Sequence, residues 1–258
     1  MAIYIRCGYN GFVDKRFDYI SSALTNKVYS RLELFDLIFR RFPTYSANSC
    51  NWIIGLLCEE GKLSPLGNGY FTKGKTLWKA EFSDEDKNVI EKIQKALPRT
   101  HISCVHSRTL NQLTPTDRCE DFLLIEVDKR DLFACYMELR NIFRREIMLT
   151  PTRRELNYYF KPKSIILNPL FSKSPCRNDG GVAIEKLVVD ILANRTIGWL
   201  YPNRDFESQL VKLLAETNVN LITALNYAKR RGTYDEVYRI CSMALPKETQ
   251  VVLGGLAL

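Results

Sequence analysis

The spacing of apolar residues between positions 28 and 75 predicts two short helices followed by a hairpin. The first apolar run has helical spacing. Ser30 precedes it and Glu33 follows three residues later, which is the spacing of a capping box. A second helical run follows, and Thr44 or Ser46 is expected to cap it. We therefore expect two amphipathic helices joined by a tight connection.

The second predicted helix carries an apolar face and a polar face. The apolar face comprises Cys50, Ile53, Ile54 and Leu57. Gly61 follows where a left-handed C-terminal residue is wanted. The candidate DNA contacts gather near the N-terminal end: Ser46, Asn48, Ser49, Asn51 and Trp52. This end of a recognition helix meets base edges, and an asparagine amide matches the N6/N7 edge of adenine.

Two other interpretations of this face stay open. An ordinary polar helix surface would present the same residue types. For Trp52 we favour packing against the segment that links the domains over contact with DNA.

A glycine-bounded hairpin follows the second helix directly. Residues 62–65 predict a strand that ends at a proline, residues 67–69 the turn, and residues 70–72 the return strand. This segment adds four candidate DNA contacts: Lys62, Asn68, Lys73 and Lys75. A solvated surface loop would explain the lysines equally well. Helix, turn, helix and hairpin in this order predict a winged helix-turn-helix over residues 16–79.

The rest of the chain alternates strand and helix patterns and then becomes helical. Residues 1–15 look irregular, residues 17–26 predict a first helix, and residues 80–98 predict a charged helix that links two domains. Strands are expected at 101–106, 121–127, 146–149, 156–159 and 164–167, and helices at about 131–144, 182–194, 205–216, 218–231 and 233–243. The expected fold is α+β: an N-terminal winged helix-turn-helix, then a mixed α/β domain over residues 99–250 with a helix-rich C-terminal end.

The distribution of charge supports a phosphate-bearing partner. The chain has 258 residues and a formal net charge of +8, and residues 1–80 hold 11 Lys and Arg against 6 Asp and Glu. A basic domain is the electrostatic footprint of a protein that binds nucleic acid. We therefore expect double-stranded DNA as the partner of the N-terminal domain.

Cysteine usage and hydropathy indicate the cellular compartment in which the protein is expected. The eight cysteines include no Cys-x-x-Cys pair, which favours small core residues in a reducing environment. The N-terminus lacks the pattern of a signal peptide, and no apolar stretch approaches the roughly 20 residues of a spanning helix. The expected location is the cytoplasm.

Two groups of residues invite a catalytic or metal interpretation. The first group comprises Glu126, Asp128 and Lys129, with Pro115 and Asp117 upstream. Metal-dependent nucleases have an acid followed by an acid-x-Lys motif, and this group misses that spacing by one position. We therefore favour a strand end with solvated charges. The other lacks the paired spacing of zinc ligands: His101, Cys104, His106 and Cys119. We expect no enzymatic activity, no metal and no cofactor.

Three further segments have a structural and a functional interpretation. Glu185, Lys186 and Asp190 share a face of a predicted helix, and a solvated or interdomain salt-bridging face is favoured. Gly180-Gly181 is expected to be a flexible loop rather than a phosphate cradle. A basic run ends another predicted helix, where it either opposes the helix macrodipole or makes a second contact with DNA: Lys229, Arg230 and Arg231.

Several sequence blocks together resemble one known family. The N-terminal blocks are Asn51-Trp52, the run from Leu56 to Leu63, and Gly67-Asn68-Gly69-Tyr70. The downstream blocks are residues 105–111, 124–129, 184–190 and 225–231. In this order they resemble the AbiE-type antitoxins, which are transcriptional regulators of type IV toxin–antitoxin systems. The resemblance extends from Val28 to about Ser242, but the family pattern has Trp-Ser-Thr where this chain has His106-Ser107-Arg108.

The resemblance implies a protein with two roles in abortive infection and phage defence. It would bind inverted repeats in its own promoter and repress an operon. It would also neutralise a co-encoded nucleotidyltransferase toxin, without a stable complex being required. Two other classes stay open: a metal-dependent nuclease built on the C-terminal domain, and a stand-alone regulator that has no toxin to restrain.

Overall fold

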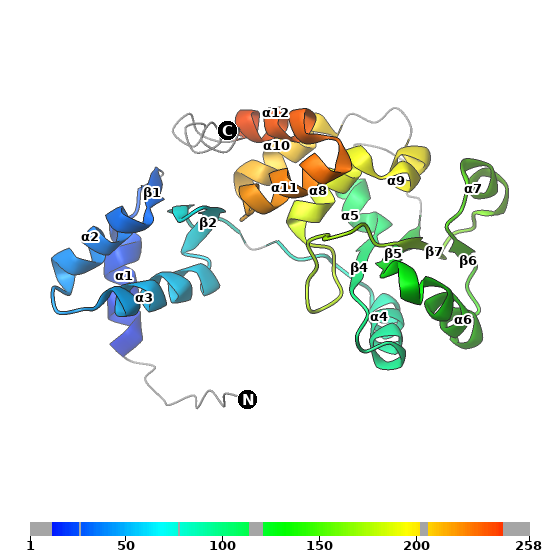
Figure 1. Cartoon of the computed structure of the whole chain (residues 1–258), viewed down its shortest axis with the longest axis horizontal. Coiled ribbons are helices and arrows are strands. Elements are labelled where there is room, and N and C mark those ends of the chain that lie inside the picture. The colour runs from blue at the N-terminus through cyan, green and yellow to red at the C-terminus, as the bar shows by residue number, and fades with distance from the viewer. Residues whose placement is uncertain (1–11, 26, 77, 114–120, 202–205, 245–258) are drawn as a thin grey trace. The chain divides into compact units, whose positions relative to one another are not determined.

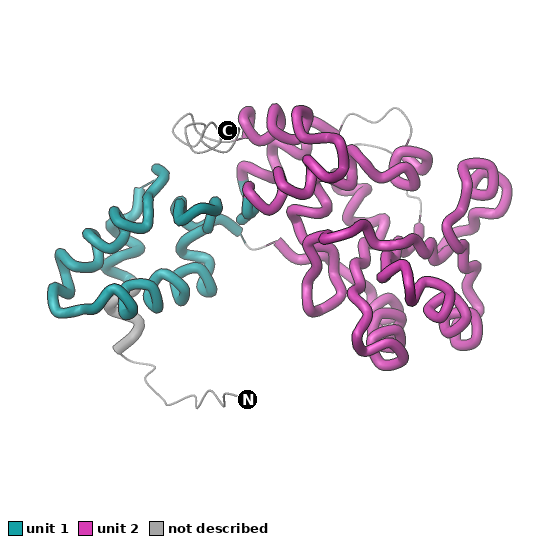
Figure 2. The backbone as a smooth tube through the Cα atoms, viewed as in Figure 1, with its two compact units in different colours: residues 1–77, 216–220, 245–258 teal, residues 78–215, 221–244 magenta. Residues whose placement is uncertain are grey.

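The computed structural model describes residues 12–25, 27–76, 78–113, 121–201 and 206–244. The chain is α+β, with helices and two small sheets (Figure 1). It divides into two compact units (Figure 2). Unit 1 comprises residues 1–77, 216–220 and 245–258, and unit 2 comprises residues 78–215 and 221–244.

Unit 1 begins with three helices and a three-stranded sheet. Its elements in chain order are α1 (Phe12–Ala23), β1 (Val28–Ser30), α2 (Arg31–Arg41), α3 (Ala47–Glu59), β2 (Leu63–Gly67) and β3 (Tyr70–Lys73). The strand order is β1-β3-β2, and both pairs are antiparallel. The helix expected at 17–26 therefore starts earlier, at Phe12, so residues 12–15 are helical rather than irregular, whereas residues 1–11 lie outside the described ranges.

Local capping determines where the helices of unit 1 start. The Ser30–Glu33 capping box is confirmed at the start of α2. Ser46, not Thr44, caps α3, because its hydroxyl accepts a hydrogen bond from the Ser49 amide. Gly61 follows α3 with φ 71°, as expected of a left-handed C-terminal residue.

The hairpin differs from the prediction at Pro65. The strand expected to end there continues to Gly67, with an irregularity in its register between the two residues. β2 lies at the edge of the sheet, where a residue without an amide donor leaves no ladder bond unmade. At the base of the hairpin, an added Cβ on Gly74 would lie 1.8 Å from the carbonyl oxygen of Gly61, so this position requires glycine.

Unit 2 is built on a four-stranded sheet that helices cover. Its first elements are α4 (Asp84–Ala96), β4 (Ile102–His106), α5 (Ser107–Gln112), β5 (Phe122–Val127), the short 3-10 helix η1 (Lys129–Asp131), α6 (Leu132–Ile142), β6 (Ile147–Leu149), α7 (Arg153–Tyr159) and β7 (Ser164–Pro169). The C-terminal helices are α8 (Ile184–Ala193), α9 (Arg195–Leu200), α10 (Glu207–Glu216), α11 (Leu221–Arg231) and α12 (Tyr234–Ala244). The strand order is β4-β5-β7-β6; β4 is antiparallel to β5, and the other pairs are parallel.

Strand alternation gives this sheet two different faces. Leu123, Ile125 and Val127 of β5 point into an apolar core that α4 and α6 complete. On the opposite face, Glu126 of β5 contacts Lys186 of α8, and α8 packs against α11. Glu126 belongs to this second face, because successive side chains along a strand point to opposite sides.

Two expectations for unit 2 are wrong. The segment 80–98 is not a linker: α4 buries Val89, Ile90 and Ile93 in the core of unit 2. Residues 156–159 are not a strand, because they complete α7, which starts at a capping box formed by Thr152 and Glu155. The short helices α5 and α9 were not expected, whereas α8, α10, α11 and α12 lie within a few residues of the predicted helices.

Across the described residues, no helix combines the length and the apolar character that crossing a bilayer requires. The cysteines within the same ranges are all free thiols. Cys119 and residues 245–258 lie outside the described residues.

Candidate nucleic-acid interface

The helix α3 presents one buried face and one exposed face. The four predicted apolar residues are buried in the core of unit 1. Ala47 and Glu59 are exposed at the two ends of the helix. Between them lies a stripe of four exposed residues, which we call the α3 stripe: Asn48, Asn51, Trp52 and Gly55. Trp52 is 55% exposed, so the expectation that it packs against the linking segment is wrong. An indole held in solvent on a stable helix is available to a partner.

The first turn of α3 is held by its two serines. The Ser46 hydroxyl accepts from the Ser49 amide at 3.1 Å, and the two hydroxyls are 3.0 Å apart. These side chains therefore fix the start of the helix, and the structure gives them a capping role in addition to the predicted DNA contact. A shallow hollow beside this turn is lined by Tyr45, Asn48, Ser49 and Trp52.

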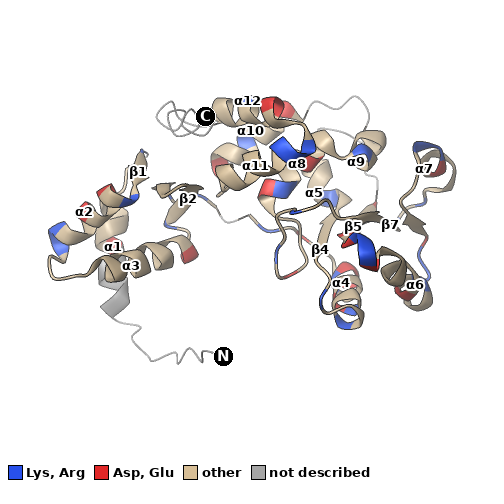
Figure 3. Ribbon diagram, in the orientation of Figure 1, with Lys and Arg blue, Asp and Glu red and all other residues tan. Residues whose placement is uncertain are grey.

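α3 contains no Lys or Arg, so the described basic residues of unit 1 belong to other elements (Figure 3). Arg40 and Arg41 end α2, and Lys73 is exposed at the end of β3. Lys62 is paired within the unit, with its Nζ 3.1 Å from Glu60 and 3.8 Å from Asp18. Of these two predicted lysines, Lys73 is therefore the more exposed and Lys62 the one paired within the unit.

The other predicted wing residues differ in exposure. Asn68 is exposed at the tip of the hairpin with φ 49°, a left-handed conformation that asparagine tolerates. Burial lowers the pKa of the Lys75 ammonium, and the Lys75 amide donates to the Ser64 hydroxyl at the base of the hairpin. Lys75 therefore lies in a less solvated position than the prediction assumed.

Arg31 lies beside the turn of the hairpin, although the sequence does not indicate it as a candidate contact. The Arg31 amide donates to the Gly69 carbonyl at 2.8 Å, which joins the start of α2 to the turn of the hairpin. A groove lies at this junction, lined by Ser30, Arg31, Leu32, Asn68, Gly69 and Tyr70. The contact is long-range in sequence, so no local pattern indicates that this arginine lies beside the hairpin turn.

A buried charge cluster lies on the second face of the sheet in unit 2. Lys186 contacts the carboxylates of both Glu126 and Asp190. Asn194 donates to Glu126 at 3.1 Å, and the Tyr227 hydroxyl donates to Asp190 at 2.9 Å. The expectation that these charges are solvated is wrong, since Lys186, Glu126 and Asp190 are all buried.

The cluster is balanced in charge. Arg231 lies with its Nε 3.5 Å from Asp190, so two cations face two carboxylates. Burial alone would lower the pKa of Lys186, but Asp190 and Glu126 outweigh it and hold the pKa above its ordinary value. Lys186 is therefore charged in the interior, where removing a partner would leave an uncompensated ion.

The contacts of Glu126 and Asp128 bear on the nuclease interpretation. Lys186 and Asn194 engage Glu126, and His101 binds Asp128 through its Nδ1 at 3.0 Å. Among the described residues, no group of three or more His, Cys, Asp or Glu is arranged to hold a metal; Asp117 and Cys119 lie outside these ranges.

The three residues of the predicted basic run at the end of α11 differ in their surroundings. Arg231 faces the buried cluster and Phe171 rather than solvent. Arg230 donates to the Lys173 carbonyl oxygen at 2.7 Å, and Lys229 is exposed. A second DNA contact at this helix end would therefore involve Lys229 and Arg230 but not Arg231.

His106 has a structural role in unit 2. Its Nδ1 accepts from the Arg108 amide at 3.0 Å and caps α5. Its Nε2 lies 3.3 Å from Asp121 and 3.5 Å from Asp86. Burial lowers the pKa of His106, although the two carboxylates act in the opposite direction.

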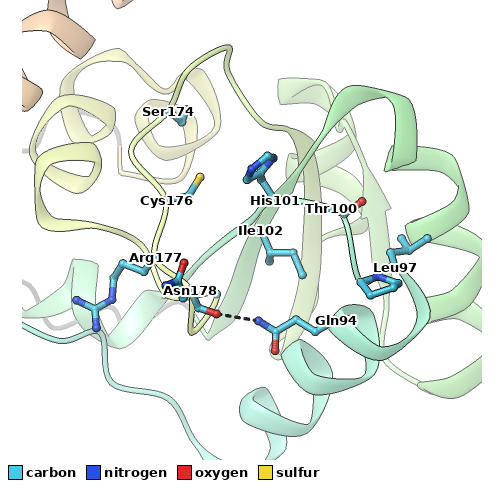
Figure 4. Close-up of a pocket in the computed structure, with 11 residues that line it drawn as sticks. Gln94, Leu97, Thr100, His101, Ile102, Ser174, Cys176, Arg177 and Asn178 are labelled. Atoms are coloured by element: carbon cyan, nitrogen blue, oxygen red, sulfur yellow. Dashed lines mark hydrogen bonds between the residues drawn. The ribbon is translucent and has the colours of Figure 1, made fainter. Parts of the chain in front are cut away.

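A pocket opens in unit 2 at the loop that precedes α8 (Figure 4). Its lining includes Gln94, His101, Cys176 and Arg177, and the Gln94 amide donates to the Asn178 carbonyl at 3.5 Å. His101 pairs with Asp128, and Arg177 with Asp179. Gly180-Gly181 is not simply a flexible loop, because the Cys104 amide donates to the Gly180 carbonyl at 2.8 Å.

Comparison with known proteins gives a family but no function. Residues 49–247 match the model of a family of unknown function, DUF6577. No curated protein matches. Among solved structures, the crystal structure of the RV2827C protein from Mycobacterium tuberculosis matches with 14% identity and a TM-score of 0.28, over 90% of this chain and 83% of that chain.

Proposed function

Because the chain belongs to DUF6577, a family of unknown function, we propose its function from the geometry of unit 1: a winged helix-turn-helix that binds duplex DNA with α3 in the major groove. The observation that carries this proposal is the order α1, β1, α2, α3, β2, β3, in which α3 keeps a polar face exposed and a hairpin follows directly. A helix fits the major groove, and a hairpin beside it reaches the flanking backbone.

In this proposal, affinity and selectivity come from different residues. Arg31 beside the wing turn and Lys73 at the end of β3 contact phosphates, as do Arg40 and Arg41 at the end of α2. These contacts are sensitive to salt and independent of base sequence. The α3 stripe contacts the bases and supplies the preference for one site over another.

The test is a titration of the full chain on its own upstream DNA and on a scrambled duplex of equal length. Replacing Asn48 and Asn51 together by alanine is expected to reduce the preference for the upstream site by roughly 5- to 150-fold, the equivalent of one good base contact. The matched control replaces two exposed asparagines of unit 2, Asn88 and Asn141, and should leave the preference unchanged. An unchanged preference in the α3 variant would remove this helix from base recognition.

We also propose that binding occludes the chain's own promoter and that the protein neutralises a co-encoded nucleotidyltransferase toxin. The support for this role is the resemblance of its sequence blocks to the AbiE-type antitoxins. The test is co-expression with the adjacent reading frame, with growth and a promoter reporter as measurements. Growth arrest that this chain relieves supports the antitoxin role, whereas an isolated gene, or a neighbour whose toxicity persists, favours a stand-alone regulator.

The nuclease alternative has a separate test. It requires cleavage that depends on a divalent ion and is lost in Glu126→Gln or Asp128→Asn. The contacts of Glu126 with Lys186 and Asn194 favour a structural role for this carboxylate instead. Cleavage by the wild type across Mg²⁺, Mn²⁺ and Zn²⁺ that either substitution abolishes would support the nuclease.

A further inference from the structure

The exposed surface of α3 carries no cation. The helix sequence is ANSCNWIIGLLCE, and its α3 stripe consists of two amides, an indole and a glycine. Guanine offers two acceptors, O6 and N7, to the major groove, and arginine or lysine is the usual partner for that pair. The α3 stripe lacks this partner.

The side chains that are present match the other base pair. Asparagine donates and accepts through one amide, which pairs with the N6 donor and N7 acceptor of adenine. Asn48 and Asn51 are one turn apart on the exposed side of α3. Trp52 adds an apolar surface, and the apolar feature of the major groove is the thymine methyl group.

Gly55 provides an independent observation. It lies inside α3, where glycine is less favourable than alanine, and its φ is not positive. A Cβ added at this position would meet nothing within 4 Å. Packing within the unit therefore does not require glycine here, and its small size serves an approach from outside, because glycine permits close contact with a ligand.

Resting on the proposed function, we propose that α3 is selective for A·T base pairs. Asn48 and Asn51 bind adenine edges, Trp52 packs against a thymine methyl group, and Gly55 lets the duplex approach the helix closely. Phosphate binding by Arg31 and Lys73 adds affinity on every sequence.

The first experiment selects duplexes from a randomised pool with the full chain and then alters single atoms of the selected site. We expect A·T pairs at the selected positions. Replacing thymine by uracil, which removes the methyl group, should weaken binding by the wild type about fivefold or more but should have little effect on Trp52→Ala. Replacing adenine by 7-deazaadenine should likewise weaken binding by the wild type but not by Asn51→Ala.

The outcomes separate this inference from the function on which it rests. Selection of G·C pairs, or equal loss on uracil substitution in the wild type and Trp52→Ala, overturns the A·T assignment and leaves DNA binding in place. If no sequence is enriched above the starting pool, the proposed sequence-selective function fails as well.

A second experiment tests the close approach at Gly55. Gly55→Ala is expected to fold normally and to bind the selected site at least about fivefold more weakly, because the methyl group separates the helix from the duplex. Gly198→Ala is the matched control, since Gly198 is exposed within α9 and an added Cβ there also meets nothing within 4 Å. Equal affinities of the two variants would overturn the close approach.

Discussion

Lys186 places an ammonium group in the interior of unit 2 between carboxylates from different elements. Asp190 lies one turn further along α8, whereas Glu126 comes from β5. Charge spacing along a helix predicts an exposed pair, because Lys and Asp four residues apart usually interact on a solvated surface. The partner that buries this pair is distant in sequence, so no local pattern reveals it.

We expect Lys186→Met to destabilise the protein strongly. The substitution leaves Glu126 and Asp190 buried without their cation, and breaking such a pair typically lowers the free energy of unfolding by about 3–5 kcal/mol. Urea denaturation followed by circular dichroism measures the change. Lys212→Met, at an exposed position of α10, is the control and should change stability by no more than about 0.5 kcal/mol. Similar losses in the two variants would contradict a structural role for the cluster.

At the scale of elements, local capping explains much of what sequence predicts correctly. The helices α2 and α3 begin where Ser30 and Ser46 provide acceptors, and the apolar face of α3 is the one its periodicity indicates. The apolar pattern of residues 156–159 predicts a strand, because its few apolar residues fit either the strand or the helix period. In the structure these residues belong to α7, which starts at a capping box formed by Thr152 and Glu155.

The α3 stripe could be predicted in part. Helical periodicity placed Asn48 and Asn51 on the exposed side of the helix, but the exposure of Trp52 required the tertiary structure, since a tryptophan is more often packed. The pairing of Lys62 with Glu60 and Asp18 depends on the fold, and so does the contact of Arg31 with the hairpin turn.

The cap of α5 makes a prediction about pH. Burial lowers the pKa of His106 in the folded protein, so below the ordinary histidine pKa of about 6.5 the unfolded chain binds a proton that the folded chain does not. Stability should therefore fall as pH decreases from about 7 to 5. His106→Asn keeps a capping acceptor but does not titrate, and its stability should fall less over the same range. Parallel curves for the two proteins in urea denaturation would exclude His106 as the source.

At the scale of the whole molecule, charge is divided unevenly. Residues 1–80 carry 11 Lys and Arg against 6 Asp and Glu, whereas the buried cluster of unit 2 is internally balanced. A surplus of cations on a unit that binds DNA, as we propose for unit 1, raises association with any duplex, and salt weakens it. The net charge of the chain is therefore an argument about binding rather than about the fold.

We expect the salt dependence of DNA binding to identify the phosphate contacts. Lys73→Gln should weaken binding to specific and scrambled duplexes by the same factor and reduce the slope of log K against log salt by about 1. Lys62→Gln is the matched control, because Lys62 already pairs with Glu60 and Asp18. Anisotropy titrations at several salt concentrations measure both slopes. A larger change for Lys62→Gln would reverse the assignment.

The buried charge cluster also constrains the synthesis of the protein. Glu126 leaves the ribosome early, whereas Arg231, the last member of the cluster, follows roughly 100 residues later, an interval of about 5–20 s at ordinary elongation rates. Until Lys186 emerges, 60 residues after Glu126, β5 has no cation to neutralise its carboxylate, and Asp190 lacks Arg231 until α11 is complete, so the sheet of unit 2 cannot reach its final packing on a nascent chain. We therefore expect unit 2 to remain accessible to chaperones and proteases until its last helices have been synthesised.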